Sequence, residues 1–213
     1  MTKNNFELSI RGIDVDSVLT IVTVLGDDIL ADCSHHVTGA KGLSTWKKHF
    51  TEYPTGCEPL HAWIRTVTAD MDGSEITARR LSPELVEAYD MEHRFRESPK
   101  EDQLSIMRAQ GHGIDEWTAW FLELSNQFHL AVIAASVNRT FFISQQGYMG
   151  MGPAATEEGD VIVVALGCDV PLMLRKESDH YLLVGECFVW GMMDGEVMRD
   201  KKLRHMLKTF CLR

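Results

Sequence analysis

The spacing of apolar residues divides the chain into a first part with helical periodicity and a later part with strand-like runs. In the first part, Leu60, Trp63, Ile64 and Val67 recur every three or four residues and predict a helix with one buried face. A longer stripe of about five turns has the same spacing. It comprises Trp117, Trp120, Phe121, Leu124, Phe128, Ala131, Val132 and Ala135. From residue 139 onward, short apolar runs are closed by Gly, Pro or Asp, which predicts strands joined by tight turns.

Other elements are expected before residue 139. Residues 6–10 alternate and predict a strand that ends at Gly12, and residues 15–25 predict a second, β-branched strand with a helix as the alternative. Ser44 is a candidate N-cap for a helix over the aromatic residues that follow it. Ser82, Pro83 and Glu84 provide an N-cap hydroxyl, a first-turn proline and an acid near the positive end of the helix dipole. They predict a charged helix or helix pair over 84–110, with a joint at 98–99.

The later part is expected to form a compact β unit. Strands are predicted at 140–144, 160–166, 172–176 and 181–190, and the short links between them favour antiparallel neighbours in a small β-barrel or sheet. Residues 197–213 predict an amphipathic closing helix with a basic face, and membrane or partner binding is the alternative for that face. We therefore predict an α+β fold and one domain over 1–213. It has a mainly helical part with N-terminal strands (1–138), a barrel-like part (139–196) and the closing helix (197–213).

Composition and charge narrow the classes of function. With 45% hydrophobic and 24% charged residues, the chain of 213 residues is typical of a globular protein. Its formal net charge of -10 repels phosphate backbones, so nucleic acid is not an expected partner. No apolar run reaches the length of a membrane span, and the residues after Met1 do not form the apolar core of a secretion signal. Five cysteines without close pairs are typical of reduced thiols, so the expected location is the cytoplasm.

Metal and cofactor sites have recognisable spacings, and the sequence does not contain them. The cysteines and histidines between Cys33 and His61 include no pair with the spacing that completes a tetrahedral metal site. Walker loops, dinucleotide fingerprints and nucleophile elbows are also absent from the sequence. We therefore expect neither a metal nor an organic cofactor.

A series of short motifs begins at residue 139 and ends at residue 196. Its residues, in order, are Arg139, Phe141, Phe142, Gly147, Tyr148, Gly150, Gly152, Pro153, Gly159, Asp160, Val170, Pro171, Leu174, Arg175 and the run from Gly191 to Glu196. Their order and spacing resemble the C-terminal portion of fungal heterokaryon-incompatibility (HET) proteins. The resemblance implies a β-rich end after a helical middle region, and it places Arg65 and Asp70 in a helix of that middle region.

Two departures from the HET pattern affect what the resemblance implies. The family commonly has His where this chain has Trp190, so the role of that imidazole is either absent or replaced by an apolar ring. The N-terminal effector region typical of the family is expected to be missing, because residue 1 falls almost at the start of the segment that follows it. A chain of this kind would bind, recognise or catalyse on its own.

The strand expected at 181–190 places Glu186 on an otherwise apolar face, beside Phe188. A carboxyl group desolvated there has a raised pKa and could act as a general acid or base. Pairing of Glu186 with a buried Arg175 or Arg65 is the structural alternative. Arg65 could likewise clamp a substrate or form a buried ion pair with Asp70.

Two functions from different classes are consistent with these features. The first is a stand-alone, HET-derived protein of fungal secondary metabolism, namely a cofactor-independent cyclase or isomerase that holds an apolar terpenoid or polyketide intermediate in a shaped cavity. Its candidate catalytic residues are Glu186 and Arg65. Its candidate substrate-binding residues are Trp117, Trp120, Phe121, Phe188 and Trp190. The second is a non-catalytic recognition module that binds a protein partner or another HET chain, and a homo-oligomer is left open in both.

Overall fold

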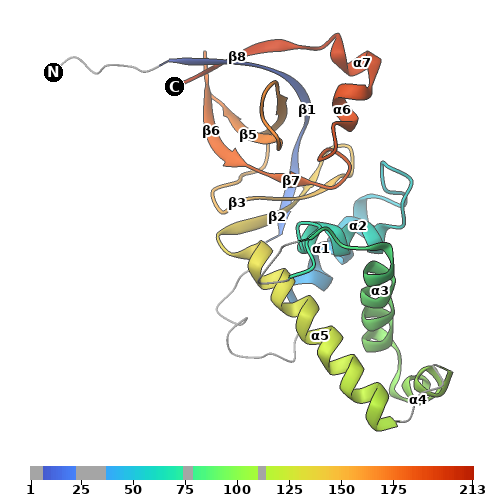
Figure 1. Cartoon of the computed structure of the whole chain (residues 1–213). Helices are drawn as coiled ribbons and strands as arrows, with labels where there is room; N and C mark the ends of the chain where they lie inside the picture. The colour runs from blue at the N-terminus through green and yellow to red at the C-terminus, as the bar shows by residue number, and fades with distance from the viewer. Residues whose placement is uncertain (1–6, 23–36, 74–78, 110–113) are drawn as a thin grey trace.

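The structure is a computed structural model that describes residues 7–22, 37–73, 79–109 and 114–213. The five longer helices gather at one end of the molecule, and the strands lie at the other end together with two short helices (Figure 1). The helices are α1 (Val37–His49), α2 (Pro59–Val67), α3 (Pro83–Glu97), α4 (Lys100–Ala109), α5 (Ile114–Ser136), α6 (Glu196–Arg199) and α7 (Lys201–Arg204). The strands are β1 (Leu8–Val22), β2 (Arg139–Ser144), β3 (Met149–Pro153), β4 (Val161–Ala165), β5 (Leu172–Lys176), β6 (Tyr181–Glu186), β7 (Phe188–Val189) and β8 (Lys208–Leu212). The predicted α+β class is confirmed.

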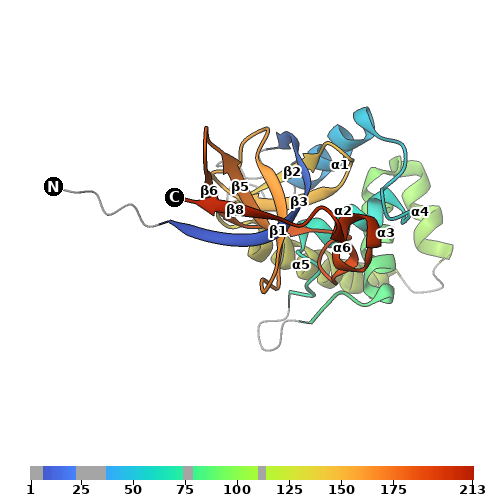
Figure 2. The ribbon, with the colours of Figure 1, turned by 90° about the horizontal axis from the view of Figure 1, so that it is seen from above.

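Strand β1 belongs to both halves of the β structure. Its first half pairs with β8 and β4, and its second half pairs with β2, which continues to β3 and β7. The pairings β1–β4–β5–β6–β8–β1 run around a ring, and Figure 2 shows β8 running beside β1 with β5 and β6 on the same side. All ring neighbours are antiparallel except β6 and β8, which meet in the single parallel pair Tyr181–Leu212. The body is therefore barrel-like, and its narrowest joint is the β6–β8 contact.

The prediction of two N-terminal strands separated at Gly12 is wrong, because β1 runs through this residue without a break. Here the glycine permits a close approach between strands. A Cβ atom at Gly12 would lie 2.8 Å from the carbonyl oxygen of Val164 on β4. Residues 6 and 23–25 of the two expected strands lie outside the described residues.

The closing helix predicted over 197–213 is also wrong in its second half. The helical turns α6 and α7 are short, and the chain then extends as β8 alongside β1. Phe210 and Leu212 are buried in β8, whereas Lys208 is exposed. In a segment this short, the apolar spacing fits a strand as well as a helix, and burial of Phe210 against the barrel decides the outcome.

The helical end is built largely as predicted. Residues Leu60, Trp63, Ile64 and Val67 of α2 are all buried in a core shared with α1, α3, α5 and the β2–β3 strands. The N-cap at the start of α3 is confirmed, since the Ser82 side chain accepts a hydrogen bond from Leu85 N. The joint at 98–99 separates α3 from α4 as expected.

Two expectations for this end need correction. Ser44 is not an N-cap, because α1 begins at Val37 and the Ser44 hydroxyl donates to the Lys41 carbonyl within the helix. The Gly-rich stretch after residue 147, for which no strand was expected, forms β3. The described helices include none that is both long enough and apolar enough to cross a membrane.

The motif residues that carry the HET resemblance hold the barrel together. Arg175 donates to both carboxylate oxygens of buried Asp160, at 2.8 and 2.9 Å, which joins the Gly-Asp and Leu-Arg motifs. A Cβ at Gly150 would lie 2.3 Å from Phe142 Cζ, so this glycine allows β2 and β3 to pack as they do. The Trp46 indole donates to the Gly147 carbonyl at 2.7 Å and fastens the motif to α1. These motif residues therefore specify architecture.

Candidate functional site

A cavity of about 480 Å³ lies where the helical end meets the barrel. The end of α2 and the turn after it, the last turns of α5, the start of β2 and the β6–β7 junction form its walls. Its lining residues are Thr68, Ala69, Met71, Gly73, Ala131, Ala134, Ala135, Arg139, Val170, Glu186, Cys187, Phe188 and Met193. A volume of this size is typical of sites that bind a small molecule or a few side chains.

The turn after α2 reaches the cavity through an unusual backbone conformation. Ala69 and Asp70 have φ values of 50° and 58°, in the left-handed region. A Cβ atom makes this region costly, and non-glycine residues remain there only when the surrounding structure holds them. Because Ala69 lines the cavity in this conformation, the turn is a candidate functional element.

Glu186 lies at the cavity but is not desolvated, so the prediction of a buried general acid is wrong. Its side chain is 64% exposed, and Oε1 accepts a hydrogen bond of 2.9 Å from Arg139 Nη2. The expected alternation fails because the pairing of β6 with β5 breaks register between Leu183 and Gly185, one position before Glu186. Gly185, with a φ of 152°, lies at this break. The alternative prediction, an ion pair of Glu186 with Arg175 or Arg65, is wrong about the partner, since Arg175 pairs with Asp160.

Arg65 lies outside the cavity lining, in an ion-pair network beneath the barrel. It pairs with Asp70, donates to the Leu81 carbonyl at 3.1 Å, and places its guanidinium 4.8 Å from the centre of the Trp190 ring. Burial raises the pKa of Asp70 more than the neighbouring Arg65 and Arg80 lower it. Of the two roles expected for Arg65, the structure therefore shows the ion pair with Asp70.

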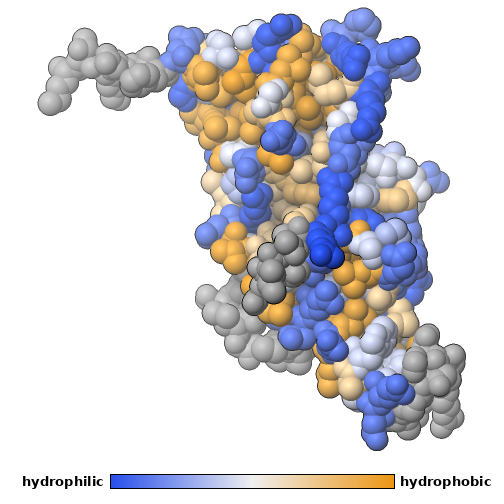
Figure 3. All heavy atoms as spheres, viewed as in Figure 1, coloured by the Kyte–Doolittle hydropathy of each residue, from blue (hydrophilic) through white to orange (hydrophobic). Residues whose placement is uncertain are grey.

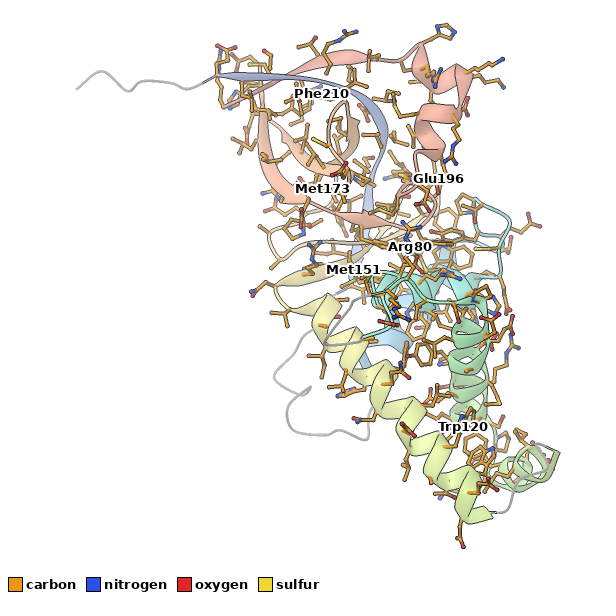
Figure 4. All side chains as sticks on the ribbon, in the orientation of Figure 1. Arg80, Trp120, Met151, Met173, Glu196 and Phe210 are labelled. Atoms are coloured by element: carbon orange, nitrogen blue, oxygen red, sulfur yellow. The ribbon has the colours of Figure 1, made fainter. Side chains whose placement is uncertain are left out.

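Arg80 extends the same network to the barrel. It donates to Asp194 Oδ2 at 2.7 Å, and the Asp194 amide donates to Glu196 Oε2 at 2.6 Å. Figure 4 shows Arg80 and Glu196 near the junction between the two ends of the molecule. These contacts tie the helical end to the segment that follows β7.

The aromatic residues of α5 do not line the cavity, contrary to the predicted aromatic pocket. Trp117 and Phe121 stack at 4.7 Å and pack on Phe95 of α3, and Trp120 is partly exposed. Helix α5 is 23 residues, or about 34 Å, long, so its first turns lie well beyond the sheet. Figure 4 shows Trp120 at this far end. Of the predicted site residues, only Glu186 and Phe188 belong to the cavity lining.

Several residues that line the cavity could not be selected from the sequence. Ala131, Ala134 and Ala135 form its α5 wall, and their small side chains leave the space open. Arg139 was visible as the first residue of the HET-like motifs but not as a lining residue. The closely spaced alanines at the end of α5 are the signal that could have indicated a hollow.

Potential metal ligands occur on α2 and α3, apart from the cavity. Glu58, His61 and Asp90 each offer one donor atom, and these atoms lie within 4.8 Å of one another. Cys33, His35 and His36 lie outside the described residues.

A barrel-like ring held by the HET-like motifs, with a helical end and a cavity at the junction, defines a HET-related β-barrel module. The family model described as the Het-6 beta-barrel domain matches residues 75–207, and the chain belongs to this family. A 60-residue stretch is 42% identical to the Heterokaryon incompatibility protein 6, OR allele, of Neurospora crassa. That stretch covers 26% of this chain and 9% of the Neurospora protein, so the match spans a small part of that relative. No solved structure matches the chain.

Proposed function

We propose that this chain is a recognition module related to heterokaryon incompatibility, and that it binds an amphipathic segment of a partner protein along α5 and in the adjoining cavity. Family membership supports the relation to incompatibility proteins. The observation that carries the proposal is the presence of apolar residues on two opposite faces of α5.

The inner face of α5 packs into the hydrophobic core, where Leu124 and Phe128 are among its buried residues. The outer face is defined by five exposed residues with spacings of three, four or eight. They are Ala119, Leu122, Leu130, Ala134 and Val137. A surface helix normally has one apolar face, and a second one indicates a docking surface. Figure 3 shows orange patches among blue ones along the part of the surface that α5 occupies.

The outer face is continuous with the cavity, because Ala134 belongs to both. A partner helix on the outer face could therefore insert one side chain into the cavity, as anchor residues do at hot spots. Exposed Asp115 and Glu123 lie on α5 as well, so lysine or arginine at the edge of the partner's apolar face would be attracted.

Selection from a displayed library of amphipathic helical peptides tests the proposal. We expect the enriched peptides to combine apolar residues at helical spacing with basic flanks. Their affinity should fall at least tenfold for Leu130→Glu, which places a charge at the centre of the outer face. Leu166→Glu is the matched control, because Leu166 is similarly exposed on the barrel. Equal effects of the two variants, or no enrichment, would refute the proposal.

A second candidate is the cofactor-independent cyclase or isomerase of fungal secondary metabolism. The cavity volume favours it, together with Phe188 in the wall and the Arg139–Glu186 pair at the same cavity. The exposure of Glu186 and the distant aromatic residues of α5 speak against it. Incubation with terpenoid and polyketide intermediates, followed by mass spectrometry, tests this candidate. Conversion that Glu186→Gln abolishes would favour chemistry over recognition.

A further inference from the structure

Four metal-ligating side chains converge where α2 packs against α3. The Nε2 atom of His61 lies 2.8 Å from Asp90 Oδ2, 3.6 Å from Glu58 Oε2 and 3.9 Å from Glu87 Oε1. In a tetrahedral zinc site with bonds of about 2.0–2.1 Å, ligand atoms lie roughly 3.3 Å apart. The three separations from His61 Nε2 bracket this value, and the donor atoms of Glu58, His61 and Asp90 all lie within 4.8 Å of one another, with Glu87 next to His61 as a further carboxylate.

Helical spacing directs the four groups toward one another. Glu58 is the N-cap residue of α2, and His61 follows three positions later. Glu87 and Asp90 have the same spacing on α3. Residues three apart share one face of a helix, and a Glu-x-x-His pair supplies two ligands to one metal in carboxylate-rich metal sites. Packing of α2 on α3 sets one pair against the other.

The charges of the group are unbalanced. Arg94 donates to Glu58 Oε1 at 2.7 Å and pairs with Asp90 Oδ1, so it neutralises one of three carboxylates. Two carboxylate charges remain beside His61, and a divalent cation would balance them. Arg94 binds mainly the oxygens that face away from His61, as an outer-shell group that orients metal ligands does.

Asp90 is suited to the role of an anionic ligand. Asp90 is only 5% exposed, pairs with Arg94 through Oδ1 and presents Oδ2 to His61 Nε2 at 2.8 Å. For metal binding, the neutral imidazole must carry its proton on Nδ1, which leaves Nε2 as the ligand atom.

We propose that Glu58, His61, Glu87 and Asp90 form a binding site for a divalent transition-metal ion, which fastens α2 to α3. One imidazole nitrogen with carboxylate oxygens suits Zn²⁺ among the common ions. The site is separate from the cavity and does not depend on the proposed recognition function.

Titration calorimetry with ZnCl₂ on the full chain tests this site. We expect one zinc equivalent whose affinity falls at least tenfold in His61→Ala and in Asp90→Asn. His49→Ala is the matched control, because His49 is exposed on α1, and it should bind as the unaltered chain does. Zinc should also raise the thermal unfolding midpoint of the unaltered chain but not of His61→Ala.

Cobalt absorption provides a readout that does not depend on stability. Intense visible bands in the unaltered chain, lost in His61→Gln, are expected for tetrahedral coordination at this site. Circular dichroism establishes that each variant is folded before it is compared. Failure of the unaltered chain to bind zinc, or equal binding by His61→Ala, would overturn the proposal and leave an ion-pair network only.

Discussion

Replacing Asp160 by alanine tests whether the Gly-Asp and Leu-Arg motifs are structural. The Asp160 carboxylate is 2% exposed, and it accepts two hydrogen bonds from Arg175 and one of 2.8 Å from the Glu157 amide. Removing one partner of a buried ion pair costs about 3–5 kcal/mol, because the other charge is left uncompensated. Arg175 is 27% exposed and also bonds Glu157 and the Ala155 carbonyl, so part of this cost is recovered. We expect the free energy of unfolding to fall by about 2–3 kcal/mol.

Urea unfolding followed by tryptophan fluorescence measures this loss. With a slope of about 2 kcal/mol per molar urea, the midpoint should fall by roughly 1 M. Asp14→Ala is the control, because Asp14 forms an exposed ion pair with Lys208 at 2.9 Å, and such pairs contribute less than about 1 kcal/mol. If Asp160→Ala lowers the midpoint no more than Asp14→Ala does, the structural role assigned to these motifs is refuted.

Three further predictions concern packing, thiol reactivity and pH. Gly150→Ala places a Cβ 2.3 Å from Phe142 Cζ and should lower the free energy of unfolding by about 1–3 kcal/mol in thermal denaturation, whereas an unchanged midpoint would contradict the packing. Burial raises the pKa of Cys187 to about 12, so iodoacetamide at pH 8 should label exposed Cys168 and leave Cys187 unmodified by peptide mass spectrometry until the chain unfolds. The pKa of Asp90 is lower in the folded chain than in the unfolded chain, where it is about 3.9, so the ionised carboxylate stabilises the fold above that pH. This contribution is lost as the pH falls through the pKa of the folded state. Asp90→Asn should therefore lower stability at pH 7 and flatten its decline in acid, and an unaltered pH profile would exclude the effect.

The helices α2 and α5 and most of the later strands follow from local periodicity, because each carries its apolar residues at one clear spacing. Strand β8 could not be predicted in this way, because it pairs with β1, which is distant in the sequence, and local spacing carries no information about that pairing. The same limit applies to Gly12. Residue identity alone does not distinguish a glycine that ends a strand from one that lets two strands approach closely.

The candidate site was harder to predict than the fold. The buried stripe of Trp117 and Phe121 was expected correctly, but periodicity does not say which element covers a helix, and Phe95 of α3 covers this one. Alternation assigned Glu186 to an apolar face only on the assumption that the strand kept its register through Gly185, and the pairing with β5 shifts there. The cavity arises from small side chains brought together in three dimensions, and no motif encodes such a space.

The HET-like signature proved informative about architecture and silent about chemistry. Asp160 and Arg175 bind each other, and Gly150 makes room for Phe142. Residues with such structural roles identify a fold, whereas function must be argued from the surfaces and cavities that the fold presents.

The pairing of β1 with β8 has a consequence for synthesis on the ribosome. During translation, β1 emerges before every other strand of the ring, and β8 emerges after all of them. One edge of β1 therefore has no neighbour until β8 has been synthesised about 190 residues later, and contacts between such distant segments form slowly. In that interval, the nascent chain offers an open strand edge of the kind that chaperones shield from aggregation.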